Sequence, residues 1–322
     1  MIDVVALGEL LIDFAAKSTD SAGYPTMAAN PGGAPGNFLA ALNAYGRKTA
    51  FLGKVGNDAF GNLLLGTLKG AGIETRGIRV DDSVFTTLAF VTLDKNGDRD
   101  FTFYRRPGAD TLLTVKNIPF GRIAQSRVYL FGGVSLSQDP TRAAVFYSLF
   151  KLSGTSVLRA FDPNLRPVLW EDLDEAKALG RKAMGLCDIL KLSSEEAVFF
   201  SGRQNPLDGA RALQEEFRIP LVLMSMGSKG CSVLLRGDCC HLDAIPTQSV
   251  DTTAAGDSFF GAFLHRLLQH SFTSLDELSP GQIVEAAQFA TAAASITVSR
   301  RGSIPALPVL EEIQAVLTKK EA

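Results

Sequence analysis

The chain has 322 residues, 46% of them hydrophobic and 20% charged, so it has ample apolar material for a large core and no compositional sign of disorder. Its formal net charge is −2, and the interleaving of basic and acidic residues excludes the positively charged face that nucleic-acid binding requires. Four cysteines without C-x-x-C spacing and three scattered histidines exclude a structural zinc site.

The first apolar run, residues 4–16, is not typical of a signal peptide. It contains Glu9 and Asp13 and has no basic leader, and no other segment is long enough to span a bilayer. Together with the cysteine pattern, this predicts a reduced cytoplasmic protein that has no membrane partner.

Short β-rich runs alternate with helical patterns along most of the chain. Strands are expected, in chain order, at residues 3–7, 49–55, 128–131, 157–161, 189–192 and 221–224. Helices are expected between them at about residues 37–45, 58–71 and 141–152. This alternation predicts an α/β fold with a doubly wound, mostly parallel sheet.

Two segments interrupt the alternation. Residues 11–29 show little helical periodicity, and residues 86–104 form two alternating runs joined by the turn sequence Asp-Lys-Asn-Gly at 94–97. Beside the carboxyl ends of parallel strands, a small β-rich unit of this kind would act as a lid, although an ordinary edge hairpin is the alternative. The predicted division is an α/β core of residues 1–10, 30–85 and 109–322 with a lid of residues 11–29 and 86–108.

The pattern changes after about residue 219. A short β meander is expected over residues 221–242, followed by long Ala-rich helices at about 255–269 and 280–298. The second half of the chain is therefore expected to end the sheet and cover it with helices.

The start of the first of these helices carries the strongest chemical signal. Small side chains at Ala254, Ala255 and Gly256 leave the first backbone N–H groups uncovered, and those groups attract an anion such as phosphate. Asp257 lies in the first turn, where its carboxylate could accept a proton from a hydroxyl that attacks phosphorus. Stabilising the helix start is the alternative role for Asp257.

A second polar signal lies at residues 31–37, Pro-Gly-Gly-Ala-Pro-Gly-Asn. Gly32 and Gly33 allow a ligand to approach the backbone, and the amide of Asn37 suits sugar hydroxyls. Taken alone, the glycines could equally form a turn and Asn37 could start a helix.

The two stretches together resemble the two signatures of the ribokinase-like carbohydrate kinases, in the order that family requires. The resemblance implies that ATP donates its γ-phosphoryl group to a primary sugar hydroxyl, with Asp257 as the base and the amides of residues 254–257 as an anion hole. Ala254 departs from the glycine usual in the family. A left-handed backbone there would cost about 1 kcal/mol.

Three patterns, at residues 8–13, 103–110 and 161–166, resemble the fructokinase branch. They imply that Asp13 accepts hydrogen bonds from sugar hydroxyls and that one of the two neighbouring arginines, preferably Arg105 over Arg106, closes over the substrate. Arg166 follows Asp162 and Asn164 at a strand end and is a further candidate for a sugar or phosphate ligand. Fructose is the expected substrate. The acid sugar 2-keto-3-deoxygluconate is the alternative, because the arginines could bind its carboxylate.

The nucleotide side carries no P-loop motif and no G-x-G-x-x-G after the first strand, which excludes a P-loop kinase and weakens a dehydrogenase interpretation. The resemblance instead assigns ATP to Lys191, Ser193, Glu196, Ser225, Gly227, Gly230, Gly256 and Thr291. Ser193 and Thr291 replace asparagines that are frequent in the family.

The resemblance further implies Mg²⁺ with Glu196, a K⁺ ion held near Asp251, Thr253 and Ser303, and a homodimer. A catalytically impaired sugar or nucleotide sensor is the non-enzyme alternative, because Ala254 departs from the family pattern.

Overall fold

The computed structural model describes residues 2–93 and 99–321. The turn expected at residues 94–97 lies outside the described residues. Among these described ranges, no helix combines the length and the apolar character needed to cross a membrane.

A nine-stranded sheet forms the centre of the molecule, with the order β13-β12-β11-β10-β9-β8-β1-β4-β5. Its strands are β1 (Val4–Leu7), β4 (Thr49–Gly56), β5 (Glu74–Asp81), β8 (Val128–Gly132), β9 (Leu158–Asp162), β10 (Ile189–Ser193), β11 (Leu221–Ser225), β12 (Cys231–Leu235) and β13 (Asp238–Leu242). Neighbouring strands are parallel from β11 to β5, and β12 and β13 complete the sheet antiparallel. The expected parallel sheet and the meander at its end are therefore confirmed.

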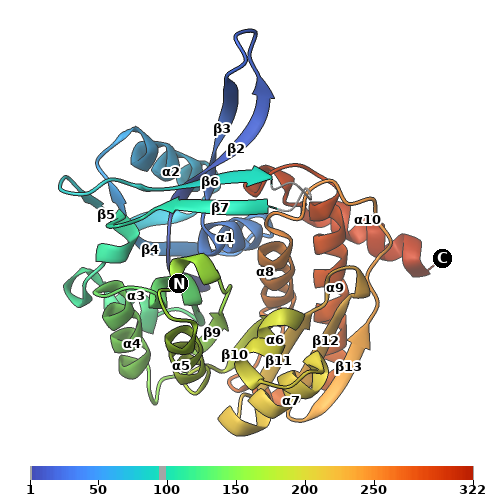
Figure 1. Ribbon diagram of the computed structural model, residues 1–322. Coiled ribbons are helices and arrows are strands. Elements are labelled where there is room, and N and C mark those ends of the chain that lie inside the picture. The colour runs from blue at the N-terminus through green and yellow to red at the C-terminus, as the bar shows by residue number, and fades with distance from the viewer. Residues whose placement is uncertain (1, 94–98, 322) are drawn as a thin grey trace.

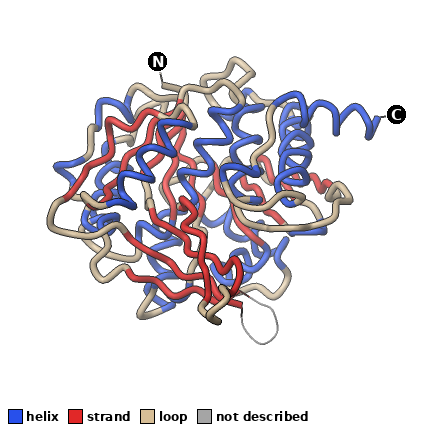
Figure 2. The backbone as a smooth tube through the Cα atoms, turned by 90° about the horizontal axis from the view of Figure 1, so that it is seen from above, coloured by secondary structure: helices blue, strands red, loops and turns tan. Residues whose placement is uncertain are grey.

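Helices cover both faces of this sheet (Figures 1 and 2). One face packs against α1 (Ala34–Ala44), α2 (Ala59–Gly70), α8 (Ala255–Leu267), α9 (Pro280–Val298) and α10 (Leu310–Glu321). The other packs against α3 (Phe120–Ala124), α4 (Thr141–Lys151), α5 (Leu173–Met184), α6 (Ser194–Ser201) and α7 (Pro206–Phe217). Each central strand alternates between the two cores, since Val4 and Ala6 join the first and Val5 and Leu7 the second.

A separate four-stranded sheet, in the order β3-β2-β6-β7, lies beside the main body. It consists of β2 (Leu11–Thr19), β3 (Pro25–Gly32), β6 (Thr87–Leu93) and β7 (Arg99–Tyr104). The pairs β2–β3 and β6–β7 are antiparallel, whereas β2 and β6 run parallel. The β2–β3 hairpin projects well away from the helices in Figure 1.

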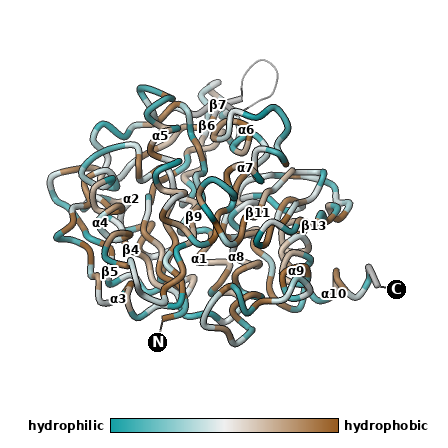
Figure 3. Tube along the Cα trace, turned by 90° about the horizontal axis from the view of Figure 1, so that it is seen from below, coloured by the Kyte–Doolittle hydropathy of each residue, from teal (hydrophilic) through white to brown (hydrophobic). Residues whose placement is uncertain are grey.

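Two helix boundaries differ from those expected by two residues or more. Helix α1 begins at Ala34, three residues before the expected Asn37, because Gly33 turns the chain with φ 114° and Pro35 is suited to a first helical turn. Helix α8 ends at Leu267, two residues early. The hydropathy colouring of Figure 3 shows hydrophilic segments mainly in the outer loops, as expected for a core shared by two helix layers.

Candidate active site

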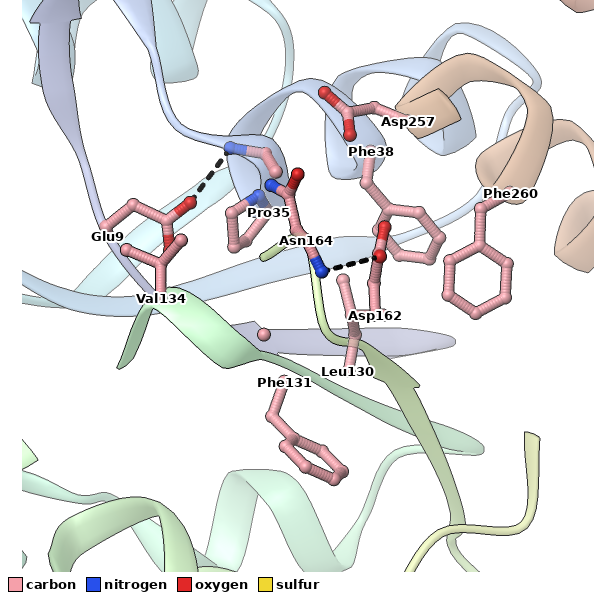
Figure 4. Close-up of a pocket in the computed structure, with 12 residues that line it drawn as sticks. Glu9, Pro35, Phe38, Leu130, Phe131, Val134, Asp162, Asn164, Asp257 and Phe260 are labelled. Atoms are coloured by element: carbon pink, nitrogen blue, oxygen red, sulfur yellow. Dashed lines mark hydrogen bonds between the residues drawn. The ribbon is translucent and has the colours of Figure 1, made fainter. Parts of the chain in front are cut away.

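Strand β1 lies between β8 and β4, so the direction in which the chain adds strands changes there. In open α/β sheets, ligands bind in the crevice outside the carboxyl ends of the strands at such a point. A pocket lies there and is lined by Glu9, Ala34, Pro35, Phe38, Leu130, Phe131, Gly132, Val134, Asp162, Asn164, Asp257 and Phe260 (Figure 4). It brings together residues from both ends of the chain.

The start of helix α8 forms one side of this pocket. Ala254 precedes the helix with φ 59° and ψ 6°, and no side chain caps the helix. The residue therefore has the left-handed conformation that disfavours alanine by about 1 kcal/mol. Because no side chain caps the helix, the backbone N–H groups of its first turn have no side-chain acceptor, and this arrangement attracts an anion.

Asp257, in the first turn of α8, is held by the other end of the chain. The Asn37 amide Nδ2 donates a hydrogen bond to Asp257 Oδ2 at 2.9 Å, between residues 220 positions apart. Burial raises the pKa of Asp257 to about 6, although Asn37, Lys191 and Arg166 oppose that rise. A buried carboxyl with a pKa near the working pH suits general-base chemistry.

The glycines of the first signature lie against the start of β2 and the end of β1. A Cβ atom on Gly32 would lie 2.3 Å from Asp13 Oδ2, and one on Gly33 would lie 2.4 Å from the Glu9 carbonyl oxygen. Glycine is therefore required at position 33, where the clash is with backbone, whereas a side chain at position 32 would displace the carboxylate of Asp13, which lies directly beside Gly32.

A buried ion pair lies beneath the α8 start. Lys191 Nζ donates to both Asp162 oxygens, at 3.0 and 3.2 Å, and a Cβ atom on Gly256 would be 3.1 Å from Lys191 Nζ. Burial lowers the pKa of Lys191, but Asp162 and Glu196 outweigh that effect and the pKa is raised. A fixed positive charge thus reinforces the positive end of the helix.

Glu196 is buried beside this pair and is engaged by the backbone. Its Oε2 accepts the N–H of Ser193 at 2.7 Å, its Oε1 accepts the N–H of Leu165 at 2.8 Å, and Ser193 Oγ in turn accepts the Glu196 N–H. This capping box fixes the start of α6. Burial raises the pKa of Glu196, while Lys191 lowers it.

Asp251 ties the loop before α8 to the loop after α9. Its Oδ1 accepts the N–H and the hydroxyl of Thr253, and its Oδ2 accepts the N–H of Gly302 at 3.0 Å. The Ser303 hydroxyl donates to the Pro31 carbonyl at 3.1 Å. The segments expected to flank a K⁺ site therefore lie next to each other and to the first signature.

Comparison with known proteins identifies the family, since residues 1–310 match the model described as pfkB family carbohydrate kinase. The chain belongs to that family. It is 36% identical over 317 residues to Fructokinase-2 of Solanum lycopersicum, which covers 98% of this chain and 95% of that protein.

Two solved structures are similar over their full length. The fructokinase from Xylella fastidiosa with bound ATP has a TM-score of 0.91 and 28% identity, covering 99% of each chain. A double mutant of fructokinase from Vibrio cholerae O395, with fructose, ADP and a potassium ion bound, has a TM-score of 0.87 and 29% identity, covering 98% of each chain.

Within this carbohydrate kinase, the two neighbouring arginines face opposite ways. Arg105 is 3% exposed and its guanidinium contacts Asp110 Oδ2 at 2.8 Å, Ser137 Oγ at 2.7 Å and the Val134 carbonyl at 3.2 Å. The side chain of Arg106 is 69% exposed. Arg105 is thus anchored behind the pocket wall, and the expected swing over the substrate is not the conformation seen here.

The predicted nucleotide residues gather at the ends of β10 and β11 and on α9. Ser225 Oγ donates to the Leu192 carbonyl at 3.2 Å, and Gly227 and Gly230 have φ of 57° and 88° in the turn that follows. Thr291 is buried on α9 and donates to the Ala287 carbonyl at 2.8 Å. Thr291 lies close to this turn, since its hydroxyl is 3.7 Å from the sulfur of Cys231, the residue after Gly230.

Glu9 is a charged pocket residue to which the sequence pattern assigned no role. It lies two residues after the fully buried strand β1, and Asp162 is the last residue of β9, so both stand at the carboxyl end of a parallel strand, and that shared position was the available signal. Nothing in the sequence indicated that its carboxyl group would turn inward. Asp162 likewise gains its role from Lys191, which comes from the neighbouring strand β10.

Proposed function

We propose that this kinase transfers the γ-phosphoryl group of ATP to the primary hydroxyl of fructose and releases fructose 6-phosphate and ADP. The observation that carries the proposal is the buried Asp257, fixed by Asn37 at the open start of α8. The fructokinase named above that binds fructose and ADP supports the choice of sugar. The curated relative is also a fructokinase, which disfavours 2-keto-3-deoxygluconate.

Asp257 acts as the general base. As the hydroxyl oxygen bonds to the γ-phosphorus, its proton passes to the Asp257 carboxylate, and the bond to the oxygen shared with the β-phosphate breaks. The hydrogen bond from Asn37 holds Oδ2, so Oδ1 is available for the substrate. The first amides of α8, with Lys191 beneath Gly256, stabilise charge on the transferring group.

The sugar lies between the two signatures in this proposal. Asp13 accepts hydrogen bonds from sugar hydroxyls, and Gly32 and Gly33 let the ring approach the backbone. Arg166, which is half-buried and close enough to lower the pKa of Asp257, faces the phosphate side. Arg105 contributes by holding the pocket wall at Val134 rather than by direct contact.

ATP occupies the region of Ser225, Gly227, Gly230 and Thr291, because glycines with positive φ let a flat ring approach the backbone. Mg²⁺ supplies charge neutralisation on the phosphate oxygens, and Glu196 would reach it only through water, since its oxygens already accept backbone N–H groups. The oxygen donors brought together near Asp251, Thr253 and Ser303 suit a hard cation such as K⁺.

The four-stranded sheet serves as the lid in this proposal, and it is also the surface for a second copy. Tyr104 on β7 is 65% exposed and Tyr24, in the turn between β2 and β3, is 69% exposed, and large exposed aromatics are typical of interfaces. Tyr104→Ser should convert a dimer into a monomer in sedimentation. The four cysteines are unpaired, which fits a reducing cytoplasm.

An ADP-release assay tests the function on fructose, 2-keto-3-deoxygluconate, ribose, mannose and adenosine. We expect the highest kcat/KM with fructose and a lower activity when K⁺ is replaced by a bulky organic cation. A preference for another sugar would overturn the choice of fructose. Absence of turnover with all five would favour the sensor alternative.

A further inference from the structure

Glu9 is a buried carboxyl group with one oxygen that lacks a partner. It is 3% exposed. Its Oε1 accepts the N–H of Ala34, the first residue of α1, at 3.1 Å. Its Oε2 is buried without a hydrogen bond among the described residues. Native proteins leave few such atoms unsatisfied, so an orphaned oxygen that lines a pocket has its hydrogen bonding completed by a bound water or by a ligand group.

The charges around Glu9 do not pair with it. Arg105 and Asp110 are the charged groups that act on Glu9, and Arg105 is already paired with Asp110 at 2.8 Å. Burial raises the pKa of Glu9 to about 7, and Asp110 adds to the rise, while the N–H groups of Glu9 and Ala34 and the charge of Arg105 oppose it. Asp162 and Asp257, which line the same pocket, are acidic and therefore cannot form an ion pair with Glu9.

The hydrogen bond to Ala34 decides which oxygen carries a proton. Because Oε1 accepts an N–H, the proton of the neutral acid resides on Oε2. A protonated carboxyl can donate a hydrogen bond, whereas the ionised form can only accept. Asp13 and Asp257 act as acceptors in the proposed site, so Glu9 supplies the donor that they lack.

We propose that Glu9 is a sugar-binding residue whose protonated Oε2 donates a hydrogen bond to a substrate oxygen other than the one phosphorylated. This inference rests on the proposed function, because it takes the pocket to hold the sugar. Figure 4 shows Glu9 and Asp257 on either side of Asn164, and all three residues line the same pocket. Through Ala34, the same carboxyl couples the sugar to the start of α1.

The two carboxyl groups must then be in opposite protonation states. Asp257 works when ionised, above its pKa of about 6, and Glu9 works when protonated, below its pKa of about 7. The plot of kcat/KM for the sugar against pH should therefore be bell-shaped, with a narrow maximum between these values. Its descending limb belongs to Glu9.

The test uses the full chain with Glu9→Gln and Glu9→Met, with Glu195→Gln on the exposed face of α6 as the control. We expect Glu9→Gln, which keeps a donor at every pH, to retain a similar KM for the sugar and to lose the descending limb. Glu9→Met should raise that KM about threefold to tenfold, the loss of one neutral hydrogen bond. The KM for ATP and the melting temperature are measured alongside.

An unchanged descending limb in Glu9→Gln, or an unchanged sugar KM in a folded Glu9→Met, would overturn the role of Glu9. Wild-type turnover separates this result from a failure of the proposed function. If the wild type prefers another sugar, the choice of fructose is wrong, and the variants are compared on that sugar with the same expected outcomes. If it phosphorylates no sugar, both proposals fall.

Discussion

Helices α1 and α8 both begin at the pocket, yet their first amides are treated differently. At α1, the N–H of Ala34 donates to Glu9, so the protein itself supplies the acceptor. At α8, no side chain caps the helix and Lys191 lies beneath Gly256. At the start of α1, the hydrogen bonding is satisfied within the protein, and this helix end forms part of the pocket wall. At the start of α8, the N–H groups lack a side-chain acceptor and Lys191 adds positive charge, which suits the reversible binding of a phosphate group.

The two starts also differ in what precedes them. Gly33 has φ 114° and its backbone packs against the Glu9 carbonyl, so no side chain fits there. Ala254 has φ 59°, which alanine tolerates at a modest energetic cost. A residue other than glycine is tolerated where the only cost is backbone strain, as at Ala254. It is not tolerated where its side chain would clash with the backbone, as at Gly33.

The sharpest test of the open helix start is Asp257→Asn. Loss of the base should lower kcat by about 10²–10⁴-fold while leaving the melting temperature nearly unchanged, because the amide keeps an oxygen that can accept the Asn37 hydrogen bond. Steady-state ADP release measures this effect. Asp174→Asn, in the first turn of α5, is the matched control. A kcat within tenfold of the wild type would argue against a base.

Lys191→Met removes the charge beneath α8. It leaves Asp162 buried without its partner, so the free energy of unfolding should fall by about 3–5 kcal/mol in chemical denaturation. Adding Asp162→Asn should restore part of that loss. Lys69→Met, on the exposed side of α2, should have little effect. Equal stability of Lys191→Met and wild type would mean that the pair is not buried as described.

Gly33→Ala tests the closed helix start. The backbone conformation alone should cost about 1–3 kcal/mol of unfolding free energy, and the clash with the Glu9 carbonyl should also raise the KM for the sugar. Thermal melting and sugar kinetics measure the two effects. The control is Gly66→Ala, in the open on α2, which should be neutral or stabilising. A neutral Gly33→Ala would show that this turn can relax.

The pH dependence of kcat/KM, which also reports on the start of α8, should show a smaller effect than the substitutions above. The pKa of Asp257 is raised to about 6, so the carboxyl is protonated below that pH and cannot act as a base. We expect kcat/KM to fall about tenfold per pH unit below 6. Initial rates between pH 5 and 7 measure this limb, and a flat profile there would exclude Asp257 as the group that titrates.

Ala254→Gly should have the smallest effect. Glycine relieves the left-handed strain, but it also gains freedom in the unfolded chain, so the gain in unfolding free energy should be below about 1 kcal/mol. Activity should stay near that of the wild type. Arg218→Gly, also left-handed but at the end of α7, should give a similar gain. A marked rise in kcat for Ala254→Gly alone would show that the alanine distorts the anion hole.

Local patterns predicted the elements of this fold well. The central strands are uninterrupted apolar runs because helices cover both faces, and small residues ahead of an apolar helix indicated the start of α8. The pairing of Asn37 with Asp257 could be expected only through the family resemblance, because no periodicity links residues 220 positions apart.

The sequence alone could not predict which side chains would contact each other. Strand alternation predicted that only one of Arg105 and Arg106 would face inward, and the preference for Arg105 agrees with their exposure. The partners Asp110 and Ser137, which come from later elements, hold its guanidinium in place. Whether Ala254 would be left-handed was equally undecidable, since it depends on how the loop from Asp251 meets the helix.

The hydrogen bonds of Asp251 and Ser303 bear on the timing of activity during synthesis. The Pro31 carbonyl accepts its hydrogen bond from Ser303, and Asp251, in the loop before α8, accepts one from Gly302, so both bonds form only after the last part of the chain has been made. During synthesis, Gly32 and Gly33 are therefore made long before the segments that hold Asp257 in place. The site is therefore complete only when residues 302 and 303, close to the C-terminal helix, contact the loop before α8 and the first signature.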